Sequence, residues 1–196
     1  MTLSAHDTKL NQIVLCSAAL FDSRGYHQTS MVDIAEDVGI KKPTLYHYVT
    51  SKEEILFLIH QEFVELLFVA QEHRNKTGGN PDELLLGAMI DILSLMRTHR
   101  SHVRVFFEHH RELPERFAST ISERRDAYFD VICSIISKGN EQGFFDVPDV
   151  RLVTLAIFGM CNWAYTWYHV DGGMSTEEIG AQFWGWLADG IRERPD

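Results

Sequence analysis

The sequence has few cysteines, little glycine and proline, and no apolar run long enough to span a bilayer. Cys16, Cys133 and Cys161 are an odd number without a C-x-x-C pair, which argues against a disulfide framework and favours a reducing compartment. No basic segment leads into an apolar one at the N-terminus, and polar residues interrupt the most apolar stretch, 152–168. We therefore expect a cytoplasmic protein without a membrane partner.

Positive charge is also scarce, with 18 Lys and Arg against 28 Asp and Glu, a formal net charge of −10. A chain this acidic is, as a whole, a poor partner for nucleic-acid phosphates. The excess negative charge is unevenly distributed along the chain, however. Residues 1–52 hold five basic and five acidic side chains, so residues 53–196 carry 13 − 23 = −10. An N-terminal DNA-binding segment is compatible with this division.

Glycine and proline make up only 13 + 5 = 18 of the 196 residues, and 45% are hydrophobic, which excludes a disordered chain. The apolar residues recur at helical spacing, and no convincing period-2 alternation marks a strand. The pattern predicts an all-α fold of about nine helices, with the clearest break at 75–81. The S-x-x-E sequences that begin at Ser51 and Ser175 predict capping boxes at two helix starts.

Two short predicted helices, about 30–37 and 41–47, are separated by a turn that contains Gly39. Ile34 and Ala35 of the first helix face the core in this arrangement, and Leu45 anchors the second helix from beneath. Such a pair is typical of a helix-turn-helix, whose second helix enters the DNA major groove. An αα-hairpin without a DNA role fits the same periodicity.

The residues of this segment resemble the N-terminal signature of TetR-family transcriptional regulators. The resemblance is carried by Thr29, Ile34, Ala35, Gly39, Ile40, Leu45, Tyr46, Tyr48, Ser51, Lys52, Glu53 and Leu56. It implies a three-helix helix-turn-helix DNA-binding domain over 1–52 and a helical ligand-binding and dimerisation domain over 53–196. It also implies a homodimer on a palindromic operator in double-stranded DNA.

The resemblance also implies which residues contact DNA. The predicted contact residues are Thr29, Ser30, Lys41, Lys42, Pro43, Thr44, Tyr46, His47 and Lys52. Lys42 and its neighbours face the groove, whereas Thr29, Tyr46 and Lys52 match positions beside the phosphate backbone. Lys41 stands where relatives often carry a capping Ser, and Pro43 replaces a frequent Gly; both bear on which bases are read.

The C-terminal half resembles TetR regulators of fatty-acid and steroid catabolism, several of which respond to acyl-CoA thioesters. The matching residues are Gly139, Gly143, Phe145, Gly159, Asn162, Trp163, Trp167, Tyr168, Gly172, Ser175, Glu178 and Ile179. The predicted helix 149–168 is apolar nearly all round and needs cover on more than one side. The resemblance implies that the last two helices supply this cover by pairing with a second copy of the chain.

An apolar effector pocket is expected between the fifth and eighth helices. Its candidate residues are Arg104, Phe107, Arg125, Tyr128, Phe129, Asn162, Trp163 and Trp167. For any one of these aromatic residues taken singly, core packing is the favoured interpretation. His99, His102, His109 and His110 lack the convergent spacing that zinc requires, so we expect no metal site.

The sequence therefore predicts a TetR-type repressor released from its operator by a small apolar or acyl-CoA-like ligand. No cofactor is expected apart from this effector. The alternative is a helix-turn-helix protein controlled by a protein partner. We expect no enzyme, because the sequence has no phosphate-binding glycine loop and no nucleophile elbow.

Overall fold

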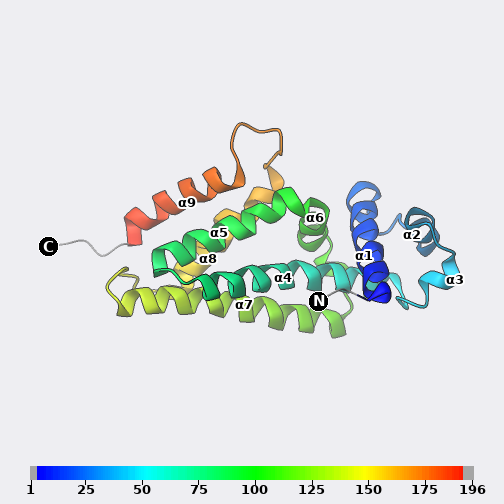
Figure 1. The fold of residues 1–196 in the computed structure, drawn as a ribbon, viewed down its shortest axis with the longest axis horizontal. Helices are drawn as coiled ribbons and strands as arrows, with labels where there is room; N and C mark the ends of the chain where they lie inside the picture. The colour runs from blue at the N-terminus through cyan, green and yellow to red at the C-terminus, as the bar shows by residue number, and fades with distance from the viewer. Residues whose placement is uncertain (1–3, 192–196) are drawn as a thin grey trace. The chain divides into compact units, whose positions relative to one another are not determined.

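The computed structural model describes residues 4–191, and every regular element within that range is helical (Figure 1). The all-α prediction of about nine helices is confirmed. The α-helices are α1 (Ala5–Arg24), α2 (Met31–Val38), α3 (Lys42–Leu45), α4 (Lys52–Thr77), α5 (Pro81–Thr98), α6 (Arg100–Glu108), α7 (Glu115–Glu141), α8 (Val150–Trp163) and α9 (Thr176–Ile191). Two 3-10 turns, η1 (His110–Glu112) and η2 (Ala164–Thr166), follow α6 and α8.

The helices form two compact units. The first unit comprises Met1–Phe63 and Ser101–Glu123, and the second comprises Val64–Arg100 and Arg124–Asp196. Each of the two longest helices, α4 and α7, contributes one part to each unit. The functional division at residue 52 remains a prediction.

Local side-chain chemistry explains where several helices begin. Ser30 caps α2: its hydroxyl accepts from the amide of Asp33, whose carboxylate accepts from the amide of Ser30 at 2.7 Å. The capping box predicted at Ser175 also forms, with Glu178 as its partner. At α4 only half of the predicted box forms, because the carboxylate of Glu54 accepts from Thr50 instead of Ser51.

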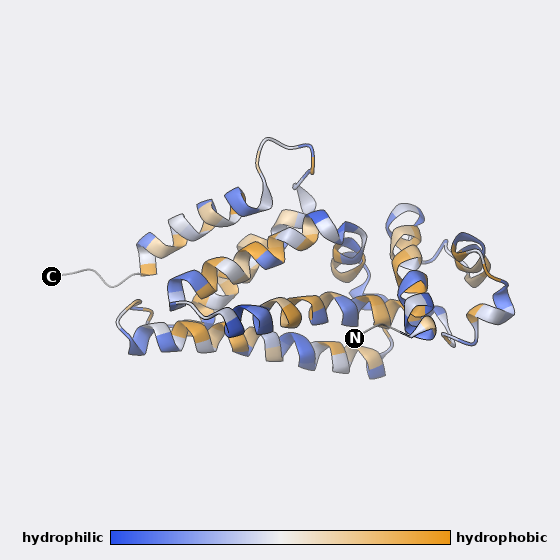
Figure 2. Cartoon of the chain, viewed as in Figure 1, coloured by the Kyte–Doolittle hydropathy of each residue, from blue (hydrophilic) through white to orange (hydrophobic). Residues whose placement is uncertain are grey.

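Each unit has its own apolar interior. In the first unit, Phe21, Ile34 and Leu45 are fully enclosed, so α1, α2 and α3 share one core. In the second unit, α5 packs extensively against α9, and α5 carries hydrophobic residues along much of its length (Figure 2). Gly180 permits this approach, since a Cβ there would lie 2.8 Å from the side chain of Ile90. No helix within residues 4–191 is both long and apolar enough to cross a membrane.

Candidate functional site

The α2–α3 pair has the geometry of a helix-turn-helix. Gly39 ends α2 in the left-handed conformation, at φ 73° and ψ 32°, and turns the chain towards α3. On the inner side, Ile34, Val38 and Leu45 are buried, so α3 is held from beneath by the core of the first unit. The short helix α3 is therefore fixed in place by packing rather than by its own length.

The outer side of α3 presents almost all of the residues predicted to contact DNA. All but two of that set are exposed, and we call the exposed residues the recognition surface: Ser30, Lys41, Lys42, Pro43, Thr44, Tyr46 and His47. Ser30 joins the surface from the start of α2, which packs against α3. Lys41 is the N-cap of α3 and makes no capping hydrogen bond with its side chain, and Pro43 lies in the first turn. The ammonium of Lys42 lies 6.0 Å from the ring centroid of Tyr46.

The structure places the remaining two predicted contact residues, Thr29 and Lys52, inward. The Thr29 hydroxyl donates to the carbonyl of Gly25 at 2.9 Å, and the residue is 1% exposed. The Lys52 ammonium donates to the carbonyls of Tyr26 and Thr29 at 2.9 and 3.0 Å, and lies 4.3 Å from the Tyr26 ring centroid. Both residues therefore hold the loop that leads into α2.

This Lys52 contact lies in a buried, polar corner of the first unit. Burial and the nearby carboxylates of Glu53 and Glu112 raise the pKa of Tyr26 to about 12, so its hydroxyl stays protonated at neutral pH. Glu112 also lies 3.5 Å from His27 Nε2 and 3.6 Å from His109 Nδ1. These contacts fasten the segment after α6 to the loop after α1. Within residues 4–191, no group of His, Cys, Asp or Glu is arranged to hold a metal ion.

The eight residues predicted to line one effector pocket are divided between the two units. Arg104 and Phe107 lie on α6 in the first unit, whereas the other six belong to the second unit. The guanidinium of Arg104 pairs with Asp22 at 2.8 Å and with Glu108 at 3.2 Å, which accounts for its charge. Helical spacing alone did not reveal Asp22, which lies 82 residues before Arg104.

The remaining predicted pocket residues fall into separate environments. Tyr128 is buried, and its ring meets the Phe158 ring edge-on, while the Phe129 ring stacks on Phe158 with a centroid distance of 5.8 Å. Trp163 is 64% exposed at the end of α8, next to Asn162. Arg125 shares α7 with Tyr128.

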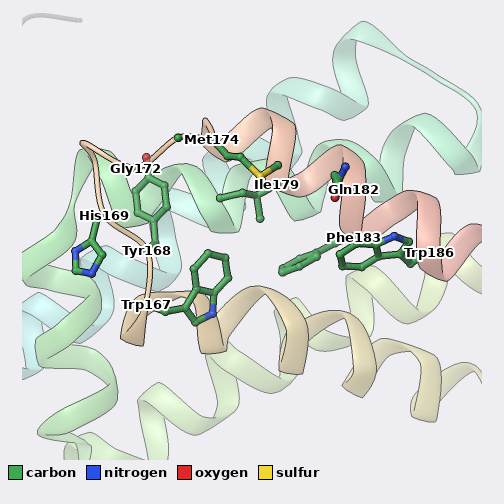
Figure 3. Close-up of a pocket in the computed structure, with 10 residues that line it drawn as sticks. Trp167, Tyr168, His169, Gly172, Met174, Ile179, Gln182, Phe183 and Trp186 are labelled. Atoms are coloured by element: carbon green, nitrogen blue, oxygen red, sulfur yellow. The ribbon is translucent and has the colours of Figure 1, made fainter.

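Trp167 lines an apolar groove between the segment after η2 and helix α9 (Figure 3). We call this cavity of about 330 Å³ the aromatic groove; it is lined by Trp167, Tyr168, His169, Gly172, Gly173, Met174, Ile179, Gln182, Phe183 and Trp186. The Phe183 ring lies between Trp167 and Trp186, with centroids 6.4 and 5.8 Å away. The sequence signal for this groove was the density of aromatic residues on both sides of the Gly172–Gly173 turn.

A second, more polar cavity of about 390 Å³ lies among α4, α5 and α7, and we call it the α4–α7 cleft. It is lined by Gln71, Asn75, Gly79, Pro81, Leu84, Val131, Ser134, Ile135, Lys138 and Gln142. None of these residues was predicted to bind a ligand. Five of the ten are polar, and the other five are aliphatic residues, glycine or proline, so no motif distinguishes them in the sequence.

Helices α8 and α9 also expose a broad set of large apolar side chains, which we call the apolar face. It consists of Leu152, Leu155 and Trp163 on α8 and Trp186 on α9, which are exposed by 62%, 58%, 64% and 66%. Exposed apolar groups of this size are typical of an interaction surface.

Two family profiles match the chain. Residues 13–59 match the bacterial regulatory proteins of the tetR family, and residues 78–191 match the tetracyclin repressor-like C-terminal domain. The chain is 27% identical over 188 residues to the HTH-type transcriptional repressor KstR2 of Mycobacterium tuberculosis, with 94% of both proteins covered.

Solved structures agree with these matches. The regulator PfmR from Thermus thermophilus is 29% identical with a TM-score of 0.84, covering 92% of this chain and 99% of PfmR. AibR in complex with isovaleryl coenzyme A and operator DNA is 28% identical with a TM-score of 0.81, covering 91% of this chain and 97% of AibR.

Proposed function

The chain belongs to the TetR family of bacterial regulatory proteins, and from this membership we propose that it is a homodimeric, ligand-responsive transcriptional repressor. The observation that carries the proposal is the recognition surface: its residues are exposed while the helix that bears them is anchored by buried Leu45. The operator is palindromic, and an acyl-CoA-like or other small apolar compound releases it.

The recognition surface has the chemistry of DNA readout. Lys42 and Lys41 offer ammonium donors to guanine acceptors or phosphates, and Thr44 offers a hydroxyl and a methyl group to base edges. Tyr46 and His47 lie at the end of α3, where their side chains reach the phosphate backbone. We assign Thr29 and Lys52 a positioning role, because their polar atoms already have backbone partners.

The apolar face supports dimerisation through α8 and α9. Burying one Leu side chain contributes roughly 1.5–3 kcal/mol, so removing Leu152, Leu155 and the two tryptophans from water stabilises an association strongly. A two-fold dimer presents the same face on both subunits and sets two copies of α3 against two half-sites of a palindrome.

The helices α4 and α7 supply a route by which an effector changes operator affinity. Each continues without interruption from the second unit, which holds both cavities, into the first unit, which carries the recognition surface. Two conformations are needed, one that binds the operator and one in which the α4 helices of the dimer are displaced and the operator is not bound. An effector that binds the second conformation more tightly lowers operator affinity, at most by the ratio of its affinities for the two conformations. AibR, which is bound to a coenzyme A thioester and to operator DNA, favours a small-molecule effector over a protein partner.

A gel-shift titration with Tyr46→Ala tests the assignment of the recognition surface. We expect weaker binding to operator and to random duplexes alike, because a phosphate contact is independent of sequence. Val69→Ala is the matched control, since Val69 is 63% exposed on α4 in the second unit. Wild-type affinity for Tyr46→Ala would show that the surface is misassigned.

A further inference from the structure

Three buried side-chain polar atoms in the second unit have no hydrogen-bond partner: Gln71 Oε1, Arg74 Nε and Tyr128 Oη. The side chains of Gln71 and Tyr128 are enclosed, with only 3% and 2% of each residue exposed. A buried polar group left without a partner is costly, and such groups are uncommon in folded proteins. Three of them on neighbouring turns of α4 and α7 therefore need an explanation.

These three residues belong to one region of the unit. Gln71 and Arg74 are three residues apart on α4, so they share one side of the helix. The Tyr128 ring meets Phe68, one turn before Gln71, at a centroid distance of 5.4 Å. The guanidinium of Arg74 extends to Asp91 on α5 and lies against Gly87, where a Cβ would overlap it.

The α4–α7 cleft leads towards this region. Gln71 lines the cleft itself. Gly87 lies one helical turn beyond the lining residue Leu84 on α5, and Tyr128 lies one turn before the lining residue Val131 on α7. On α5, Gly87 therefore lies farther than Leu84 from Pro81, the residue at which the helix begins. On α7, Tyr128 lies farther than Val131 from Lys138, which is near the end of that helix. Arg74 and Tyr128 are not lining residues themselves, but each lies within one helical turn of residues that line the cleft.

We propose that the α4–α7 cleft is the effector site, and that its inner end binds a neutral carbonyl oxygen through the Tyr128 hydroxyl and the Nε–H of Arg74. The inference rests on the proposed function, which it deepens by naming the chemical group that is recognised. Both protein groups are donors, so the missing ligand atom is an acceptor.

The charges of the region select a neutral acceptor rather than a carboxylate. Asp91 already balances the positive charge of Arg74. Burial raises the pKa of Tyr128, so its hydroxyl remains a neutral donor at physiological pH. A carboxylate would add an unbalanced negative charge to this interior, which is costly, whereas a thioester or ketone carbonyl would not.

The cleft and the side chains next to it match an acyl thioester on a long carrier. The rings of Phe68 and Phe158 border Tyr128 and give the acyl chain an apolar surrounding. Towards the surface, Gln71 Oε1 accepts from an amide N–H of the carrier. Exposed Lys138 at the outer end pairs with an anionic group of the carrier, such as a phosphate.

The decisive variant is Tyr128→Phe, which removes the hydroxyl and keeps the ring. Because that hydroxyl has no partner in the unliganded protein, the melting temperature should stay the same or rise. Octanoyl-CoA, octanoic acid and free coenzyme A are titrated calorimetrically into wild type, Tyr128→Phe and the control Tyr168→Phe. Tyr168 lines the aromatic groove, so the control also tests the rival cavity.

We expect octanoyl-CoA to bind wild type and Tyr168→Phe equally, and to bind Tyr128→Phe about 5- to 30-fold more weakly, because one hydrogen bond from a buried donor is lost. Octanoic acid should bind wild type more weakly than octanoyl-CoA. The inference is overturned if Tyr128→Phe keeps wild-type affinity, if octanoic acid binds as tightly as the thioester, or if no carbonyl compound binds wild type.

Operator affinity measured on the same samples separates this inference from the proposed function. Release of operator by octanoyl-CoA that is equal in wild type and Tyr128→Phe contradicts the carbonyl site and supports the repressor. A wild-type protein that binds no operator contradicts the proposed function itself.

Discussion

Lys42 is the first residue of α3 and Lys52 is the first residue of α4, and their ammonium groups have different surroundings. Lys42 is exposed and has only the Tyr46 ring near it, 6.0 Å away, so its charge is available to a phosphate or a base. Lys52 is held by two backbone carbonyls within 3.0 Å. We predict that Lys42→Ala reduces the salt dependence of operator binding, and that Lys52→Ala weakens binding without changing the salt dependence.

The size of the effect follows from counterion release. Each phosphate neutralised on duplex DNA contributes about 0.9 to the slope of log affinity against log salt concentration. A dimer loses two such contacts in Lys42→Ala, so the slope falls by about 1.8. Between about 50 and 200 mM salt, wild type should therefore lose roughly 12-fold more affinity than the variant does.

Lys52→Ala acts through the fold instead. The substitution removes two charged hydrogen bonds to the loop that precedes α2, at a cost of about 1–2 kcal/mol in unfolding free energy after allowance for partial exposure. Displacement of the Ser30 cap should then lower operator affinity by a similar factor at every salt concentration.

Fluorescence anisotropy with a labelled operator, measured over this salt range, provides both slopes. Lys76→Ala is the control, because Lys76 has the same charge, is 71% exposed and lies at the far end of α4. A wild-type slope for Lys42→Ala would show that Lys42 contacts no phosphate, and a lower slope for Lys52→Ala would show that Lys52 contacts one.

Three further predictions concern stability and assembly. Burial, followed by the positive influence of His110 and His109, lowers the pKa of His60 to about 4. As the pH falls, the unfolded chain, in which the His pKa is about 6.5, takes up this proton before the folded chain does. The contribution of neutral His60 to the free energy of unfolding is therefore complete above about pH 7 and is lost between about pH 6.5 and 4. Wild type should lose about 2 kcal/mol more than His60→Leu between about pH 7.5 and 5 in urea titrations, and equal losses would contradict the assignment. Leu155→Glu combined with Trp163→Glu should give a monomer in sedimentation at micromolar concentration, whereas Val69→Glu, which alters an equally exposed apolar residue on α4, should remain dimeric. Gly39→Ala should cost about 1–2 kcal/mol in thermal unfolding, because φ is 73° there, and Gly39→Asn should cost less; equal costs would place the strain elsewhere.

The DNA-binding part of the account was largely predictable from the sequence. Spacing and capping chemistry are local, so the α2–α3 turn at Gly39 and the inward direction of Leu45 followed from the pattern. Lys52 was the exception. From the sequence alone, a lysine beside a recognition helix is expected to contact a DNA phosphate. Its hydrogen-bond partners in the structure lie 26 and 23 residues earlier and become apparent only in the fold, and its contact with DNA stays a prediction.

The effector site was less predictable, because it depends on which helices pack together. Arg104 was predicted to bind a ligand, yet Asp22, 82 residues earlier, balances its charge. Arg74 was not singled out, although it reaches Asp91 and Gly87 on another helix. Tyr128 was chosen as an aromatic residue, but its unpartnered hydroxyl, rather than its ring, gives it significance. Periodicity identifies a buried face and does not identify which polar atoms on it lack partners.

One titration can establish whether the protein is a dimeric repressor whose operator affinity is controlled by an acyl thioester. An operator is first selected from random duplex DNA by the purified protein, and its affinity is then measured with and without octanoyl-CoA. We expect a palindromic sequence, two protomers for each palindrome and at least tenfold weaker binding when the thioester is present. If no sequence is selected, or if the affinity is the same with the thioester as without it, the protein is not such a repressor.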